Sequence, residues 1–264
     1  MRFDILTIFP ESLSGFFSIG ILGQAQAKGL IEVHLHDLRE FTDDPHRIVD
    51  DRPYGGGPGM VMKVEPFVRG IEAISGVRPS FLNCTHEDPG VPHPGATQKR
   101  RPDPEHMGEN VRVILLSSQG RLFRQDDAIR FSKLDGLILL CGRYQGVDER
   151  VLAFADEEIS IGDYVLSGGE VAAAVIVEAT SRMIPGIVGR FESVKEDSFY
   201  AKECLGPPQY TRPPLFRGHC VPEVLLSGDH LKIEAFRERK AWEKTTRNRP
   251  DLLGVDLDKE NADG

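Results

Sequence analysis

Short apolar runs alternate with amphipathic segments along the first two thirds of the chain. The apolar runs are rich in Val, Ile and Leu, and they predict strands at residues 2–8, 31–36, 111–117, 136–141 and 157–161. Helical spacing of apolar positions predicts helices at roughly 12–27, 65–75, 125–132, 147–154 and 169–183. Strands that alternate with helices indicate a parallel sheet with helices on both faces. The pattern therefore predicts an α/β fold.

Two stretches interrupt this alternation. Residues 79–110 are rich in proline and poor in apolar side chains, which predicts a flexible insertion between core elements. Beyond Pro185 the pattern becomes irregular until two helices, expected near 222–227 and from about 229 to 246. We therefore expect a large domain at 1–186, a linker at 187–202 and a small helical domain at 203–264.

Composition narrows the class of protein. The 264 residues are 40% hydrophobic and 28% charged, and no apolar run approaches the roughly 20 residues that span a bilayer. The first ten residues, MRFDILTIFP, carry a charge within the apolar stretch and lack a small-residue cleavage site, which predicts a strand and not a secretory signal. The 4 cysteines form no C-x-x-C pair, which argues against a disulfide framework or a zinc knuckle. We expect a cytoplasmic protein without a membrane partner.

Charge is distributed unevenly. A net charge of −9 argues on its own against a nucleic acid partner. Residues 232–249, however, hold more Lys and Arg than Glu, and Trp242, the only tryptophan, lies among them. Such a run predicts either a nucleic acid surface with an aromatic ring that can stack on a base, or a solvated helix face with one buried anchor, which is the commoner case.

Four glycine-bearing loops could carry chemistry. In IGDYVLSGGE, residues 161–170, two glycines precede an apolar helix, where backbone amides can approach a ligand. SSQGR at 117–121 and LCGRYQGVDER at 140–150 each follow a buried strand, where α/β sheets bind ligands. DDRPYGGGPGM at 50–60 is typical of either a ligand loop or a mobile connector. None matches the dinucleotide or phosphate-loop fingerprints, which argues against ordinary NAD or ATP chemistry.

Together these segments resemble the TrmD family of bacterial tRNA (guanine-N(1)-)-methyltransferases, which are SPOUT methyltransferases. The resemblance runs through nearly the whole chain. It rests on IFPE at 8–11, DDRPYGGGPGM at 50–60, CGRY and VDER within 141–150, IGDYVLSGGE at 161–170, SRMIPG at 181–186, EDSF at 196–199, YTRP at 210–213 and VPEVLLSGDH at 221–230.

The resemblance implies a fold and a reaction. It implies a SPOUT-type α/β domain with a deep trefoil knot, which periodicity alone would not suggest because threaded chains are almost absent from proteins. It also implies a helical carboxyl-terminal domain that binds tRNA, and a homodimer whose subunits share their active sites. The implied reaction moves a methyl group from S-adenosylmethionine to ring nitrogen 1 of the guanosine immediately 3′ of the anticodon, position 37, of tRNA.

The resemblance also implies which residues bind the ligands. Those that match the family's S-adenosylmethionine site are Ser117, Ser118, Gln119, Gly120, Gly142, Arg143, Tyr144, Ile161, Gly162, Tyr164, Val165, Leu166, Ser167, Gly168 and Gly169. Those implied to contact the tRNA substrate are Asp50, Gly57, Gly59, Gln145 and Ser198. Binding of the cofactor mainly by main chain suits a neutral adenine ring, which needs shape and amide hydrogen bonds more than charge.

Two residues are implied to be catalytic. Ring nitrogen 1 of guanine carries a proton at neutral pH, so a base must remove it before the nitrogen can attack a methyl group, and Asp197 matches that base. Arg182 matches the cation that stabilises the negative charge then shifted to the exocyclic oxygen. Without the resemblance, Asp197 would be interpreted as a turn residue and Arg182 as an ion-pair partner at a helix end.

One position departs from the family pattern, and two other functions stay open. Glutamate usually follows CGRY, whereas this chain has Gln145, a poorer magnesium ligand, so we predict no metal ligands and leave magnesium dependence open. The insertion at 79–110 is also longer than is typical of the family. The alternatives are a binding-only SPOUT-like RNA-binding protein and a nucleotide-dependent α/β enzyme.

Overall fold

The computed structural model describes residues 1–76, 110–189, 197–200 and 204–254. The chain forms two compact units, Met1–Val188 and Gly189–Gly264, which are described separately. Almost all of the insertion expected at 79–110 lies outside the described residues, as do parts of the linker expected at 187–202.

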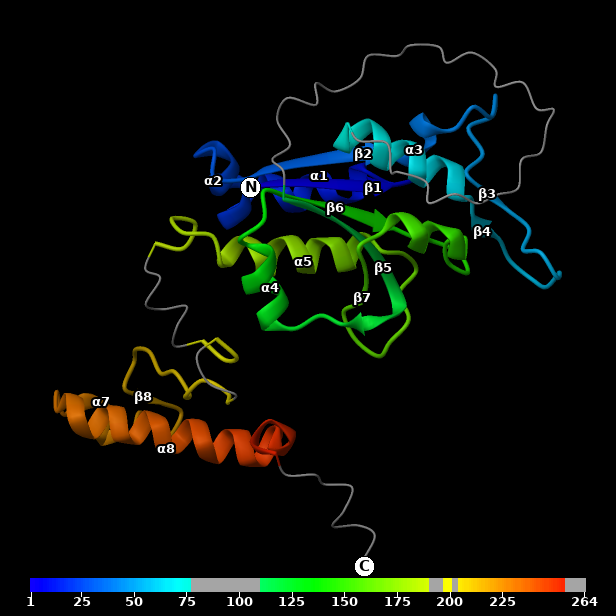
Figure 1. Ribbon diagram of the computed structural model, residues 1–264. Coiled ribbons are helices and arrows are strands. Elements are labelled where there is room, and N and C mark those ends of the chain that lie inside the picture. Colours follow the sequence, from blue (N-terminus) through cyan, green and yellow to red (C-terminus); the bar gives the residue numbers. More distant parts are fainter. Residues whose placement is uncertain (77–109, 190–196, 201–203, 255–264) are drawn as a thin grey trace, which may run out of the picture. The chain divides into compact units, whose positions relative to one another are not determined.

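A five-stranded parallel sheet forms the centre of the first unit (Figure 1). Its strand order is β2-β1-β6-β5-β7, and every neighbouring pair is parallel. This confirms the predicted α/β class and all five predicted strands. The strands are β1 (Arg2–Thr7), β2 (Glu32–Asp37), β5 (Val111–Leu122), β6 (Gly136–Cys141) and β7 (Glu157–Ser160).

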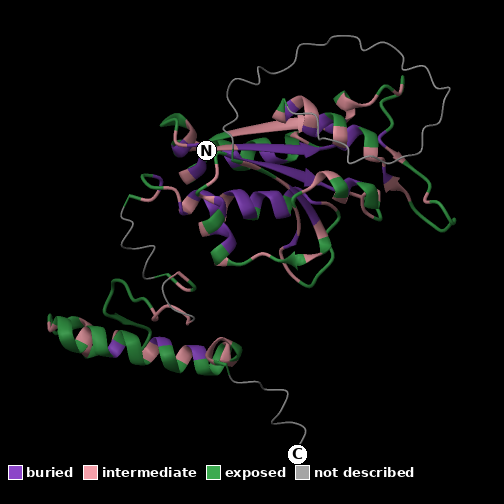
Figure 2. Ribbon diagram, viewed as in Figure 1, coloured by how far each residue is buried: buried purple, intermediate pink, exposed green. Residues whose placement is uncertain are grey.

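Helices cover both faces of the sheet, as predicted. They are α1 (Glu11–Ser18), α2 (Gly20–Ala27), α3 (Val64–Ser75), α4 (Gln125–Phe131) and α5 (Glu170–Arg182). Strand β6 contributes Leu137 and Leu139 to a core cluster shared with α1, α2, α4 and α5, and Ile138 and Leu140 to a second cluster shared with α3. Because successive strand residues point to opposite faces, a strand buried on both sides is apolar at every position. Figure 2 shows β6 and β1 buried along their lengths.

Three local predictions are wrong. The helix predicted at 12–27 is two helices, because Ile19 is extended and Gly20 has a φ of 63°, which ends the first and redirects the chain into the second. The helix predicted at 147–154 is the 3-10 helix η3 (Glu149–Phe154). The strand predicted to end at 117 continues to Leu122, with an irregularity in its pairing to β7 between Leu116 and Arg121.

Short elements that the hydrophobic pattern did not predict complete the first unit. The 3-10 helix η1 (Leu38–Phe41) follows β2, and the two-residue strands β3 (Asp50–Asp51) and β4 (Val61–Met62) pair antiparallel. The glycine-rich segment at 52–60 is therefore the loop of a small hairpin.

In the residues that the structure describes, the second unit consists of helices and one short hairpin. Strands β8 (Leu215–Phe216) and β9 (His219–Cys220) pair antiparallel, and they precede α7 (Glu223–Leu226), α8 (His230–Asn248) and η4 (Pro250–Leu253). Asp229 caps α8 by accepting a hydrogen bond from the Lys232 amide at 3.2 Å. Both helices lie where the sequence predicted them. Along the 19 residues of α8 only Phe236, Ala241 and Thr245 are buried, so most of its surface faces solvent.

Candidate functional site

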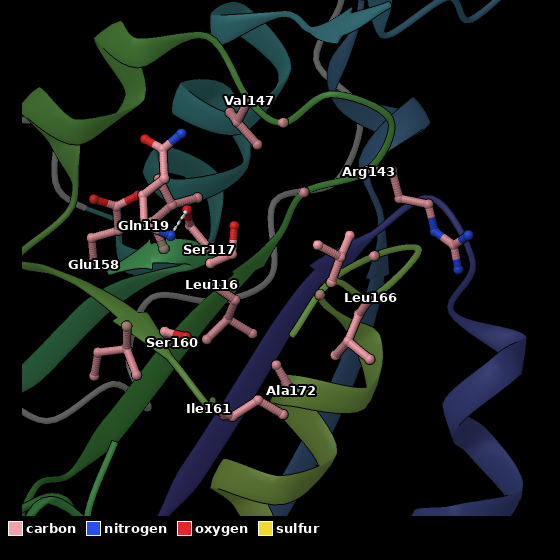
Figure 3. A pocket seen from close by; sticks show the side chains of 18 of the residues that line it. Leu116, Ser117, Gln119, Arg143, Val147, Glu158, Ser160, Ile161, Leu166 and Ala172 are labelled. Carbon is pink, nitrogen blue, oxygen red and sulfur yellow. Dashed lines mark hydrogen bonds between the residues drawn. The ribbon is translucent and has the colours of Figure 1, made fainter. Parts of the chain in front are cut away.

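A cavity of about 520 Å³ lies near the carboxyl ends of β5, β6 and β7 (Figure 3). These strands are neighbours and parallel, so the irregular stretch of β5 after Leu116 and the loops that follow β6 and β7 meet at one edge of the sheet. Residues of these three segments line the cavity, namely Ser117–Gln119, Gly142–Val147 and Ile161–Gly169 without Asp163. The structure thus brings together every residue expected at the cofactor site except Gly120, and it adds Gln145 from the expected substrate site.

Sequence reasoning missed part of this wall. Leu115, Leu116, Ile159, Ser160 and Ala172 also line the cavity; the first two lie in β5 level with the end of β6, the next two end β7, and Ala172 is in the first turn of α5. The available signal was the position of each strand end directly before a glycine loop, because the last residues of a strand share the cavity edge with the loop that follows.

Gly120 shapes the cavity without lining it. A Cβ atom on Gly120 would lie 2.4 Å from the backbone nitrogen of Ile159 and 2.6 Å from the carbonyl oxygen of Glu158. The irregular stretch of β5 after Leu116 therefore passes so close to β7 that only glycine fits.

The glycine pair at 168–169 serves the packing of the protein itself. A Cβ atom on Gly169 would lie 2.8 Å from the Cα atom of Cys141, and the Gly169 amide donates to the Gly142 carbonyl at 2.9 Å. A Cβ atom on Gly168 would lie 2.4 Å from Oε2 of Glu170 and 2.6 Å from Nε of Arg143. Both glycines line the cavity, as the approach of a ligand would require, and both are also needed for the close packing of the chain on itself.

The turn after β6 has an unusual backbone. Tyr144 is in the left-handed region with a φ of 62°, and Gly146 has a φ of 122°. A left-handed non-glycine residue costs on the order of 1 kcal/mol, so surrounding contacts must hold it. The Gln145 amide donates to the Met60 carbonyl at 3.1 Å, and the Met62 amide donates to the Gly146 carbonyl at 3.0 Å. The hairpin strand β4 thus fixes one side of the turn.

Ion pairing fixes the other side of the turn. Arg143 Nε donates to Glu170 Oε1 at 3.1 Å, and the Arg143 guanidinium lies 4.4 Å from the centre of the Phe9 ring. Figure 3 shows the Arg143 side chain directed away from Leu116 and Ser117, out of the cavity. Arg143 therefore contributes its backbone to the cavity wall while its side chain is committed to Glu170 and Phe9.

The predicted substrate residues of the hairpin separate into two groups. The Gln145 side-chain amide donates to the Pro58 carbonyl, and a Cβ atom on Gly59 would lie 2.7 Å from Gln145 Nε2, so Gly59 and Gln145 are in contact. Asp50 pairs with Met62 at the base of the hairpin, and Gly57, with a φ of 118°, lies in its loop. Neither Asp50 nor Gly57 lines the cavity.

The two expected catalytic residues lie in different units. Arg182 is the last residue of α5, whereas Ala172 lines the cavity near the start of that helix, so about 15 Å of helix separates them. Asp197 is an exposed residue of the second unit, next to Ser198, whose hydroxyl oxygen accepts a hydrogen bond from the Gly206 amide at 2.9 Å. The first unit alone therefore does not bring Arg182 to the cavity.

Within the described ranges, no group of three or more His, Cys, Asp or Glu side chains could hold a metal ion. The side-chain nitrogen of Gln145 donates to the Pro58 carbonyl, which ties this side chain to the hairpin loop. His36 contacts Asp4, with its Nε2 atom 2.8 Å from Oδ1. Among the same residues no helix combines the length and apolar character needed to cross a membrane.

Comparison with known proteins gives a consistent result. A family model described as tRNA (Guanine-1)-methyltransferase TrmD matches residues 1–87 and 98–255. The chain is 47% identical over 278 residues to a tRNA (guanine-N(1)-)-methyltransferase of Koribacter versatilis, with 99% of this chain and 96% of the relative covered. Relatives of the same name from Citrifermentans bemidjiense and Thermobifida fusca are each 45% identical, cover 98% and 100% of this chain, and are themselves covered over 92% of their length.

Proposed function

The chain belongs to the tRNA (guanine-1)-methyltransferase TrmD family, and from this premise we propose that it methylates ring nitrogen 1 of the guanosine immediately 3′ of the anticodon in tRNA. The methyl donor in this proposal is S-adenosylmethionine. The observation that carries the proposal is the meeting of three glycine loops around one cavity, in a chain whose relatives are named for this reaction. The names of the relatives do not favour a binding-only protein or a nucleotide-dependent enzyme.

The cavity suits the proposed donor. Its volume of about 520 Å³ lies within the range of roughly 300–1,000 Å³ typical of small-molecule sites. Leu116, Leu166 and Ala172 offer apolar surface to a ring, while the backbone of the three loops offers amide and carbonyl groups. When bound there, S-adenosylmethionine supplies the methyl group, and the residues of the three loops hold and orient it.

Asp197 and Arg182 are proposed to act on the guanine. The Asp197 carboxylate accepts the proton of ring nitrogen 1, which leaves a lone pair on that nitrogen to bond the methyl carbon as the carbon–sulfur bond breaks. Arg182 stabilises the negative charge that deprotonation shifts to the exocyclic oxygen. The planar guanidinium of Arg182 offers several N–H donors to that oxygen.

A homodimer would bring these groups to the cavity. The length of α5 keeps Arg182 away from the cavity of its own chain, which supports a pocket completed by a second copy. Membership of the family further supports a trefoil knot in the first unit, tRNA binding by the helical second unit, and action in the cytoplasm. No step is assigned to magnesium, because Gln145 stands where a glutamate is usual and an amide oxygen is a poorer magnesium ligand than a carboxylate.

The test is incubation of the purified protein with labelled S-adenosylmethionine and unmodified tRNA, followed by nucleoside analysis. We expect labelled 1-methylguanosine, and we expect none from tRNA whose guanosine 3′ of the anticodon is replaced by adenosine. A protein that binds this tRNA without forming 1-methylguanosine would be the binding-only alternative. Calorimetric binding of NAD or ATP in place of S-adenosylmethionine would indicate a nucleotide-dependent enzyme.

A further inference from the structure

Three segments that are distant in the sequence meet at the carboxylate of Glu170. Its Oε1 atom accepts a hydrogen bond from the Thr7 hydroxyl at 2.7 Å and one from Arg143 Nε at 3.1 Å. Thr7 ends β1, Arg143 follows β6, and Glu170 begins α5. These positions lie in or beside the IFPE, CGRY and SGGE segments, whose side chains the proposed reaction leaves without a role.

The carboxylate is deeply buried. The Glu170 side chain is 5% exposed, Thr7 is fully buried, and the Arg143 side chain is 24% exposed. A buried carboxylate is costly unless charged and hydrogen-bonding groups compensate it, and removal of one partner of such a pair is far more disruptive than removal of an exposed one. The first turn of α5 adds a favourable contribution, because the amino end of a helix stabilises negative charge. Glu170 therefore fixes the positions of the Thr7 hydroxyl and the Arg143 guanidinium.

The pair is packed directly against the cavity wall. The space where Gly168 would carry a side chain is occupied by Oε2 of Glu170 and Nε of Arg143, and Gly168 itself lines the cavity. Arg143 and Gly168 also form an isolated antiparallel bridge. The ion pair thus ties the turn after β6 to the loop that precedes α5.

We propose that Glu170 is a positioning residue for the methyl donor. Glu170 acts through Arg143, and the hydrogen bond from Thr7 orients the Glu170 carboxylate. Through this contact it holds the turn Gly142–Gly146, with left-handed Tyr144, in the shape that forms one wall of the cavity. Glu170 does not line the cavity, so its effect on the ligand passes through the turn. The identity of the ligand rests on the proposed function, whereas the positioning of the turn does not.

The principal variant is Glu170→Gln, which keeps the shape and removes the charge. We expect S-adenosylmethionine to bind about tenfold more weakly by calorimetry, as for loss of one charge-assisted hydrogen bond. The KM for the donor should rise by a similar factor, while kcat at saturating donor should change by less than about threefold, because Glu170 does not touch the reacting atoms. The matched control is Glu178→Gln, a half-buried glutamate of the same helix that is outside the cavity lining, for which both constants should stay at the wild-type value.

A second pair of variants, at Thr7, tests the proposal even if Glu170→Gln does not fold. Thr7→Val removes the hydroxyl that donates to Glu170 at nearly constant volume, and Thr7→Ser retains it. We expect Thr7→Val to weaken donor binding several-fold and Thr7→Ser to restore most of the affinity. A role in packing alone would make the two variants alike or favour valine, and that result would overturn the proposal.

Amide hydrogen exchange of the unliganded protein provides a measurement that needs no ligand. Glu170→Gln and Thr7→Val should accelerate exchange in Gly142–Gly146, whereas Glu178→Gln should leave it unchanged. Wild-type exchange rates in this turn together with wild-type donor affinity in both variants would overturn the inference. A wild-type protein that binds no S-adenosylmethionine would instead refute the proposed function, and the exchange rates would still decide whether Glu170 positions the turn.

Discussion

The two units differ in whether they bury charged side chains: among the described residues, buried carboxylates lie in the first unit, which also carries exposed ion pairs on its surface. In the first unit the carboxylates of Asp4 and Glu170 are almost completely buried, and each is paired with an arginine. In the described part of the second unit the ion pairs lie on the surface, and the side chains of Lys232–Asp229 and Lys240–Glu243 are between 37% and 75% exposed. Buried pairs hold elements together because their partners cannot be replaced by water, whereas exposed pairs contribute little to stability.

This difference indicates what each unit can do. In the first unit the buried carboxylates of Asp4 and Glu170 fix a strand and the start of a helix and do not line the cavity, whose wall combines backbone, apolar side chains and polar side chains that include Glu149 and Glu158. The cationic side chains of α8 remain solvated, and a polyanion could replace their water and counterions. We therefore expect loss of a buried charge of the first unit to lower stability, and loss of an exposed charge of the second unit to change reaction or binding more than stability.

The largest expected effect comes from an exposed charge of the second unit. Asp197→Asn should lower the rate of methyl transfer by about 10²–10⁴, because the general base is lost, while S-adenosylmethionine binding stays unchanged. The control is Asp251→Asn, which changes another exposed aspartate of the same unit and should retain full activity. Rates are to be measured with unmodified tRNA at saturating donor. Activity of Asp197→Asn within threefold of wild type would eliminate Asp197 as the base.

A buried charge of the first unit should dominate stability. Asp4 accepts two hydrogen bonds from Arg2, at 2.7 and 2.8 Å, and contacts His36. Asp4→Asn should lower the free energy of unfolding by about 3–5 kcal/mol at pH 7, because it leaves buried partners without their counter-charge. Urea unfolding measures this loss, and Asp43→Asn, in an exposed pair with Arg69, should change it little. Equal effects of the two variants would contradict the contrast between buried and exposed charge.

The same aspartate predicts a pH dependence. Burial by itself raises the pKa of Asp4, but hydrogen bonds from His36 and Arg2 outweigh it, so the pKa lies below its ordinary value of 3.8. A carboxylate with a lowered pKa stabilises the fold above that ordinary value, and the stabilisation disappears as the pH falls through the lowered pKa. The stability difference between wild type and Asp4→Asn should therefore be constant from about pH 7 to pH 5 and should shrink below about pH 4.

Backbone packing at the cavity should give an intermediate effect. Gly169→Ala places a methyl group 2.8 Å from the Cα atom of Cys141, a backbone atom that cannot easily move, so stability should fall by about 1–3 kcal/mol and donor binding should weaken. Gly15→Ala is the control, because nothing lies within 4 Å of its new methyl group and alanine favours the helix. Unfolding midpoints and calorimetry measure both changes. Identical midpoints for the two variants would show that the close approach at Gly169 is not maintained in solution.

The smallest expected effect concerns the exposed arginines of α8. The double variant Arg237→Ser/Arg247→Ser should leave the unfolding midpoint unchanged, because both arginine side chains face solvent. The tRNA affinity should fall, and the slope of log affinity against log salt should decrease by about one for each lost phosphate contact. Filter binding across a salt series measures the slope. An unchanged slope with an unchanged affinity would assign tRNA binding to another surface.

Local pattern was sufficient for most of the fold. The run GLILLC of β6 is apolar at each position because both faces of the strand are covered, and this is visible in the letters alone. The sequence of α8 is also sufficient to predict its state, because it begins after a capping aspartate and is polar along most of its length, as an exposed helix is. The prediction of one helix at 12–27 was wrong because Gly20, with a φ of 63°, redirects the chain. The periodicity of apolar positions is judged over several turns of helix, so it does not reveal a break at a single residue.

The amino-acid sequence by itself determined the α/β class, the family and the loops that line the cavity, since strand ends and glycines are local features and the motifs are ordered along the chain. Only the tertiary structure decided how these parts act on one another. The contact of Glu170 with Thr7 joins residues 163 positions apart, and Gly169 needs its hydrogen because the backbone at Cys141 lies beside it. Such contacts depend on the path of the whole chain. The packing of the sheet decides which remote residues meet and how deeply they are buried, and neither residue carries that information by itself.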